Sequence, residues 1–207
     1  MLNRFLWKYK KYPITISLIV ICVIVYLISF FLFGEEMDAL EGLYFGGFNP
    51  IYMVITHEYY RFITANFIHF GFLHLAMNCY SLYGLGMFIE KSLGIQKYLI
   101  LIAVSALSTT GLPYLFYMLT GQGANVVSGG ISGVIFGLIG ALGALALHYR
   151  YVYMDIFKQL APNIVLMLVI SFLVPSISLS GHLSGLIGGF VCTYLLLMFK
   201  HQKRLIH

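Results

Sequence analysis

The sequence predicts an all-α membrane protein: one domain, residues 1–207, with six transmembrane helices and an interfacial first loop. Of the 207 residues, 60% are hydrophobic and only 9% are charged, and the mean hydropathy is +0.91. A soluble domain carries about 25% charged residues, which keep its surface in water. The composition therefore excludes soluble enzymes, nucleic-acid-binding proteins and disordered chains.

Six charge-poor runs are long enough to cross a bilayer. A transmembrane helix needs about 20 apolar residues, because each residue adds ~1.5 Å across ~30 Å of hydrocarbon. The six runs are 14–33, 67–89, 98–119, 129–147, 161–179 and 181–199. The first run is too long for the apolar part of a signal peptide and no small-residue cleavage site follows it, so we expect a retained helix.

Residues 34–66 are expected to form a loop in the membrane interface. The segment is rich in aromatic residues, but charged residues and helix breakers interrupt it. These are Glu35, Glu36, Asp38, Glu41, Gly42, Gly46, Gly47, Pro50, Glu58 and Arg61.

The distribution of charge supports six spans. Of the 12 basic residues only Arg61 falls on the outer side, together with the five acidic residues of the first loop, and Lys and Arg concentrate on the cytoplasmic side of membrane proteins. A seventh span over 43–56 would move Lys91 and Lys97 outside. We therefore expect a multi-pass protein of the plasma (cell) membrane with both termini in the cytoplasm. The basic residues expected inside are Arg4, Lys8, Lys10, Lys11, Lys91, Lys97, Arg150, Lys158, Lys200, Lys203 and Arg204.

The cysteines do not indicate a metal site. Cys22, Cys79 and Cys192 all lie in apolar runs and share no metal-ligand spacing. We expect them to be buried as small hydrophobic side chains. No metal and no cofactor is expected.

Polar residues gather at one depth of three predicted helices. His69, His74 and Asn78 lie in the second run, Ser132 in the fourth and His182 in the sixth. These three helices enter from the outer side, so all five residues lie within ~17 Å of that boundary. Polar groups within membrane spans usually face the bundle interior or a water-filled cavity. We expect the five side chains to converge there.

Stripes of small residues predict which helices touch. Small residues four apart let two membrane helices approach closely. Ser132 adjoins the first glycine of one stripe and His182 adjoins the first of the other, so close packing would bring hydroxyl and imidazole together. The stripes are Gly133, Gly137, Gly140, Ala141 and Ala144 in the fourth run, and Gly181, Gly185 and Gly189 in the sixth.

A serine beside a histidine is the usual arrangement for nucleophilic catalysis, because the imidazole accepts the hydroxyl proton. No acidic residue lies in 129–147 or 181–199, so the pair would act as a dyad with another group orienting the imidazole. His74 and Asn78 share a helix face and can donate hydrogen bonds to an oxyanion. The residues alone leave a catalytic role and a packing role equally open.

The same residues resemble the motifs of the rhomboid intramembrane serine proteases. The resemblance runs in order from about 57 to 190, most of the chain. The matching elements are His69 to Asn78, Gly130 to Gly133, Gly181 to Gly185 with Gly189, the pair Tyr60 and Arg61, and the glycines Gly86 and Gly94 around Glu90.

The resemblance implies a six-helix rhomboid-like bundle of bacterial type and a serine endopeptidase that works through an acyl-enzyme. Ser132 would be the nucleophile and His182 the general base, with an oxyanion site made by the Ser132 N–H, His74 and Asn78. Family members often have Tyr at the position of Phe136, whose ring can still stack on the imidazole. Structural roles are implied for Gly130, Gly133, Gly181, Gly185, Gly189, Arg61, Glu90 and His69.

Partners also follow from the resemblance. They would be membrane lipids and single-span membrane proteins cut in or near the transmembrane segment, and no nucleic acid. The fifth helix and the loop 175–180 with Pro175 resemble the family's lateral gate and cap. Tyr60 replaces the family's Trp, which affects only an interface anchor.

Two further readings compete with the protease. One is a non-catalytic rhomboid-like protein that binds client transmembrane helices, in which Ser132 and His182 would be a packing pair. The other is a small transporter or proton channel, which the lack of acidic residues within the spans disfavours. A membrane metalloprotease would need His-Glu-x-x-His, and the sequence has no such string.

Overall fold

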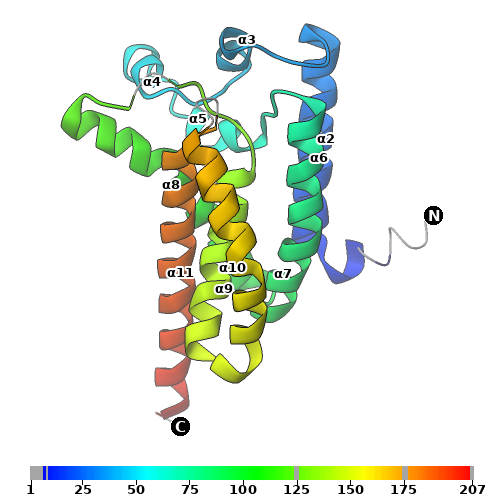
Figure 1. Cartoon of the computed structure of the whole chain (residues 1–207), viewed down its shortest axis with the longest axis vertical. Coiled ribbons are helices and arrows are strands. Elements are labelled where there is room, and N and C mark those ends of the chain that lie inside the picture. The colour runs from blue at the N-terminus through cyan, green and yellow to red at the C-terminus, as the bar shows by residue number, and fades with distance from the viewer. Residues whose placement is uncertain (1–6, 8, 124–125, 174–176, 206–207) are drawn as a thin grey trace.

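A computed structural model describes residues 7, 9–123, 126–173 and 177–205, with side chains up to 198. Arg4, Lys8 and Pro175 lie outside the described residues, as do the side chains of Lys200, Lys203 and Arg204. The described residues form helices that run back and forth between two ends of the molecule (Figure 1). The long helices are α2 (Pro13–Phe33), α6 to α7 (Phe72–Ser81 and Met87–Leu93, joined by the π-helical turn η2, Leu82–Gly86), α8 (Ile95–Thr120), α9 (Ser132–His148), α10 (Arg150–Leu173) and α11 (Leu179–Leu205).

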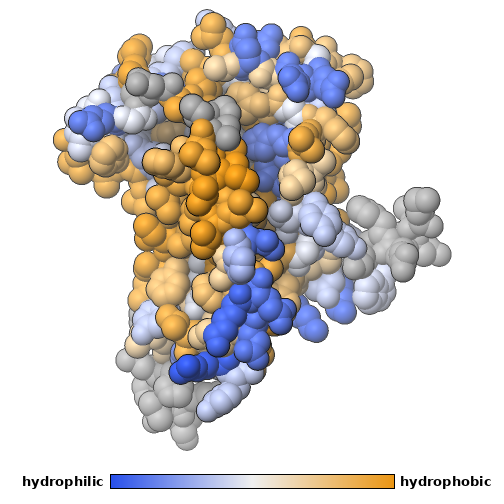
Figure 2. Space-filling model, viewed as in Figure 1, coloured by the Kyte–Doolittle hydropathy of each residue, from blue (hydrophilic) through white to orange (hydrophobic). Residues whose placement is uncertain are grey.

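The expected all-α membrane bundle is confirmed. Five helices are long and apolar enough to span a membrane: α2, α6 to α7 taken together, α8, α10 and α11 as far as Met198. With 17 residues α9 is apolar but shorter, so the count of six spans remains a prediction that depends on α9. On the face drawn in Figure 2, hydrophobic side chains cover the upper middle of the bundle, and polar ones gather at the top and over the lower part.

Several helix boundaries differ from the expected ones, and α11 continues to Leu205 where 199 was expected. The second long helix begins at Phe72 rather than at 67, because the preceding residues form the 3₁₀ turn η1 (Ala65–Phe67) and an extended link. Helix α10 begins at Arg150 and ends at Leu173, instead of covering 161–179, and it passes through Pro162 without ending. Hydropathy marks the part of a helix that lies in hydrocarbon, and α10 continues beyond that part.

The longer helices change the distribution of acidic residues. Asp155 is exposed in the first half of α10, and Glu90 is buried in α7. The expectation that no acidic residue lies within a spanning helix was therefore wrong. Neither carboxylate lies with Ser132 and His182, because Asp155 is exposed near the start of α10 and Glu90 binds the start of α2.

Helix α9 lies at the centre of the bundle, in backbone contact with α11. A Cβ added at Gly185 would collide with the carbonyl oxygen of Gly133, and one at Gly189 with the carbonyl oxygen of Gly137. The expected packing of the two stripes is thus confirmed for these pairs. Gly181 is different, because it lies against Ser178 and against α8 instead of α9.

Glu90 fixes the start of α2 to the end of α7. Its two carboxylate oxygens accept the N–H groups of Ile14 at 3.0 Å and Thr15 at 2.9 Å. These are first-turn donors that lack partners within their own helix, and the positive end of the helix dipole favours an anion there. Glu90 is 2% exposed, so water cannot replace it.

Replacing Glu90 tests this anchor. Glu90→Ala should lower the free energy of unfolding by about 2–4 kcal/mol, because two buried donors lose a charged acceptor. Glu90→Gln keeps one acceptor oxygen and should lose less. Thermal unfolding in detergent measures both. An Ala variant as stable as wild type would show that the hydrogen bonds contribute nothing.

The first loop contains three short helices, α3 (Ala39–Tyr44), α4 (Pro50–Thr56) and α5 (Arg61–Thr64). They lie together at one end of the bundle (Figure 1). The loop does not cross the bundle, which agrees with the expected non-spanning segment.

Arg61 holds this loop together from inside. Its Nη1 donates to the carbonyl oxygens of Leu43 at 2.5 Å and Gly47 at 2.8 Å, and its Nε donates to Glu58 at 2.7 Å. The hydrogen bonds from Arg61, and one from the Tyr60 hydroxyl, keep the pKa of Glu58 below its ordinary value. Arg61 is therefore part of the loop's framework.

The same loop is paired with the chain that leads into α9. Phe48 and Ser128 exchange both backbone hydrogen bonds, each 2.8 Å long, as an isolated antiparallel bridge. The N–H of Gly130 donates to the carbonyl oxygen of Ala65 at 2.9 Å. These bonds fix the turn that precedes Ser132.

Candidate active site

Ser132 and His182 meet where α9 and α11 begin. Ser132 is the first residue of α9, and His182 lies in the first turn of α11. The Ser132 Oγ lies 2.8 Å from the His182 Nε2, so the hydroxyl and the imidazole come together as the small-residue stripes led us to expect. The contact follows from the glycine pairs described above, which bring the two backbones together.

Phe136 fixes the plane of the imidazole. Its ring is stacked on that of His182, with centroids 4.3 Å apart and planes inclined by 18°. Phe136 is fully buried and follows Ser132 by one helical turn. The stacking expected for Phe in the place of Tyr is present in the structure.

The other imidazole nitrogen has a partner that the sequence did not reveal. The His182 Nδ1 lies 2.8 Å from the Oγ of Ser171 on α10. One signal could have drawn attention to this residue: Ser171 is the single hydroxyl side chain in the apolar run Ile164 to Leu173. Its partner could not be inferred, because no motif links the fifth helix to the sixth.

His74 and Asn78 lie against the turn that leads to Ser132. A Cβ added at Gly130 would come within 2.8 Å of the His74 Nε2 and 3.5 Å of the Asn78 Nδ2, so only glycine leaves room for both side chains. Gly130 also has φ +115°, which favours glycine. The expected convergence of α6 on the start of α9 is thus present.

Two donors near Ser132 are free to bind an oxygen. The Asn78 Nδ2 is buried and has no hydrogen-bond partner among the described residues, whereas buried N–H groups are nearly always paired. The backbone N–H of Ser132 is among the first of α9, which have no acceptor within the helix. Together they can stabilise negative charge beside the hydroxyl.

His69 lies next to His74 in this cluster. Its ring meets that of His74 edge to face, with centroids 5.0 Å apart. Its Nδ1–H donates to the carbonyl oxygen of Phe67 at 3.1 Å. These contacts fit a support for the His74 ring.

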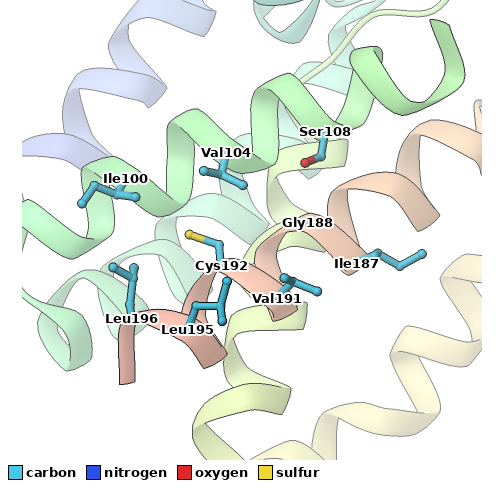
Figure 3. A pocket seen from close by; sticks show the side chains of 9 residues that line it. All are labelled: Ile100, Val104, Ser108, Ile187, Gly188, Val191, Cys192, Leu195 and Leu196. Carbon is cyan, nitrogen blue, oxygen red and sulfur yellow. The ribbon is translucent and has the colours of Figure 1, made fainter. Parts of the chain in front are cut away.

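Other candidate features lie apart from this cluster. Arg61 acts within the first loop, and Glu90 at the far end of α7. A groove of about 470 Å³ between α8 and α11 contains none of the site residues (Figure 3). Its lining is almost entirely apolar: Ile100, Val104, Ser108, Ile187, Gly188, Val191, Cys192, Leu195 and Leu196.

The cysteines only partly match their expected burial. Cys22 and Cys192 are buried, whereas Cys79 is half-buried, and all three are free. Within the described part of the chain, no group of three His, Cys, Asp or Glu side chains could hold a metal ion.

The fold defines a multi-pass membrane protein of the helical-bundle class, whose polar residues meet inside the bundle. Comparison with known families narrows this class. The family model described as Rhomboid domain matches residues 56–199, and the chain belongs to the rhomboid family.

Curated relatives carry the same family name. The chain is 33% identical over 147 residues to "Rhomboid protease GluP" of Bacillus subtilis (strain 168), a match covering 67% of this chain and 26% of that protein. It is 30% identical over 185 residues to "Rhomboid protease GlpG" of Yersinia pestis (strain Pestoides F), covering 88% and 62%. For "Rhomboid-like protein 15" of Arabidopsis thaliana the identity is 27% over 197 residues, covering 90% and 47%. The chain thus spans less than two thirds of the length of each of these relatives.

Proposed function

We propose that the protein is an intramembrane serine endopeptidase that hydrolyses peptide bonds in or near the transmembrane segments of single-span membrane proteins. The observation that carries the proposal is the 2.8 Å hydrogen bond between the Ser132 Oγ and the His182 Nε2. Membership of the rhomboid family supports it, since relatives in two bacteria are named proteases.

In the proposed reaction His182 acts first as a base and then as an acid. Its Nε2 accepts the Ser132 proton as the Oγ attacks the scissile carbonyl carbon. The tetrahedral intermediate collapses when His182 returns that proton to the leaving amine, which leaves an ester on Ser132. Water attacks the ester in the same way, with His182 again as base, and frees the enzyme.

The oxyanion of the intermediate would lie beside Gly130. The His74 Nε2 and the Asn78 Nδ2 lie 2.8 Å and 3.5 Å from the place that a Cβ on Gly130 would take, and the Ser132 N–H follows two residues along the chain. Fixed donors of this kind stabilise the charge that develops in the transition state more than they stabilise the substrate.

Asn78 offers a graded test of this site. Asn78→Ala should lower kcat about 10²-fold, because one oxyanion donor of several is lost. Asn78→Asp has nearly the same shape but replaces the donor with an acceptor, and it should lose at least as much. Steady-state cleavage of a single-span substrate measures both. A wild-type kcat in the folded Asp variant would show that Asn78 does not bind the oxyanion.

The proposed orientation places the site near the outer face of the plasma membrane and both termini in the cytoplasm. The first loop with its acidic residues lies at the end of the bundle where α9 and α11 begin (Figure 1). Lys91 and Lys97 lie around the turn between α7 and α8, beside the start of α2. This distribution is the one that the positive-inside rule favours.

Substrates would reach the site past α10, with lipids around the bundle. Only 11% of the apolar part of α10 is buried, the smallest share among the five helices that are long and apolar enough to span a membrane. A helix held by so few contacts can shift at a modest cost in free energy.

Reaction with a fluorophosphonate tests the proposed function directly. The purified wild-type protein should form a covalent adduct that mass spectrometry locates on Ser132, and it should cleave a single-span substrate in detergent. A folded protein that neither reacts nor cleaves would instead favour a non-catalytic protein that binds client helices.

A further inference from the structure

Three hydrogen bonds form a chain through the His182 ring. The Ser132 Oγ lies 2.8 Å from Nε2, the Ser171 Oγ lies 2.8 Å from Nδ1, and the Ser171 Oγ lies 2.7 Å from the carbonyl oxygen of Met167. Ser171 is 4% exposed and His182 is 7% exposed. The chain therefore runs through the interior of the protein.

The Met167 carbonyl at the end of this chain determines which atom donates and which accepts in each hydrogen bond. A carbonyl oxygen only accepts, so the single hydroxyl hydrogen of Ser171 points to Met167. The Ser171 Oγ then accepts a hydrogen bond from the imidazole, which requires the proton to be on Nδ1. The lone pair of Nε2 therefore faces Ser132, and the Ser132 hydroxyl donates to it.

This is the tautomer that a general base needs. In other serine hydrolases a carboxylate on Nδ1 holds the imidazole in this form, and the wrong tautomer costs ~10⁴ in kcat. Phe136 fixes the ring plane, but stacking does not prevent the ring from rotating within its plane. Ser171 provides that second constraint.

The packing of α10 singles out the same residue. All 24 residues of α10 are described, and Ser171 is the one that is buried. The neighbouring side chains Ile170, Phe172 and Leu173 are exposed. The one fully buried side chain of this helix is thus the one that bonds His182.

We propose that Ser171 is a positioning residue for the general base: its hydroxyl accepts the Nδ1–H of His182 and so presents the Nε2 lone pair to Ser132. The inference rests on the proposed function and adds the group that takes the place of a triad's third member. Ser171 is neutral, so it orients the ring without supplying negative charge.

The decisive comparison uses Ser171→Thr and Ser171→Val, which have nearly the same shape and differ in the hydroxyl. Val should lower kcat about 10- to 100-fold with KM unchanged. The loss is smaller than that for the carboxylate of a triad, because the hydrogen bond removed here is one between neutral groups. Thr should restore most of kcat, because its hydroxyl can still bond the carbonyl one turn back. Ser171→Ala should resemble Val.

A buried serine elsewhere provides the matched control. Ser29 on α2 is 2% exposed, and its hydroxyl donates to the Tyr26 carbonyl of its own helix at 2.9 Å. Ser29→Ala removes the same kind of bond and should leave kcat unchanged. An equal loss of kcat in Ser29→Ala and Ser171→Ala, or equal kcat in the Thr and Val variants, would overturn the proposal.

Nitrogen NMR of ¹⁵N-histidine-labelled protein in detergent reads the tautomer without turnover. The His182 signals, identified by their absence in His182→Ala, should show a protonated Nδ1 in wild type and a mixture in Ser171→Val. A wild-type proton on Nε2 would overturn the positioning role. A wild type that neither cleaves nor reacts with fluorophosphonate would overturn the proposed function instead, and the NMR result would still decide the role of Ser171.

Discussion

Purified Ser132→Ala protein should cleave a single-span substrate more than about 10⁴-fold more slowly than wild type, because the proposed nucleophile is absent and the remaining donors cannot form an acyl-enzyme. The fall should be in kcat, since substrate binding does not require the hydroxyl. Initial rates in detergent, with a substrate whose two products are separated by electrophoresis, measure it.

The control for this substitution is Ser92, whose hydroxyl bonds a carbonyl of its own helix. The Ser92 Oγ donates to the Phe88 carbonyl oxygen at 2.8 Å, near the end of α7. Ser92→Ala should cleave at the wild-type rate. Residual cleavage by Ser132→Ala at more than about a hundredth of the wild-type rate would assign the nucleophile to another residue.

His182→Ala should cause a loss of similar size, because no other described side chain lies within hydrogen-bonding distance of the Ser132 hydroxyl. Without the base the hydroxyl keeps its proton and is a weak nucleophile. The fall should exceed about 10⁴-fold in kcat, and the reaction with fluorophosphonate should slow in parallel. His148→Ala, at the other end of α9, serves as the control.

The double variant makes this prediction sharper. Residues that act as one unit give non-additive losses, so Ser132→Ala combined with His182→Ala should be no slower than the slower single variant. Losses that multiply would mean that the two side chains act in separate steps.

The helix pattern followed from the sequence where apolar residues run without interruption. The run expected at 14–33 forms α2, Pro13–Phe33. The bounds agree because this helix begins and ends where the apolar stretch does. For α10 the same reasoning failed at both ends. Its first half carries the exposed residues Arg150, Asp155 and Lys158, so the helix begins before the apolar run from which its start was predicted.

The Ser132–His182 contact was also predictable, because glycines four apart indicate which helix faces touch. Gly185 and Gly189 behave as the pattern indicates, whereas Gly181 faces α8 and Ser178. Spacing identifies a small-residue face, but it does not say which neighbour each residue meets near a helix end.

Ser171 shows where sequence reasoning stops. A single serine in an apolar helix normally bonds the carbonyl of its own preceding turn, as Ser171 does with Met167. Its second partner depends on how α10 crosses α11. No stripe of small residues records that crossing, and it becomes visible only in three dimensions.

The backbone bridge between Phe48 and Ser128 matters to anyone who would re-engineer the first loop. Exchanging the exposed tip of α3 or α4 leaves both peptide groups in place. A one-residue insertion next to Phe48 would instead shift the pairing and turn its side chain to the opposite face. The exposed ends of α3 and α4 should therefore tolerate replacement by other sequences, whereas the residues beside Phe48, which pair with Ser128, should not.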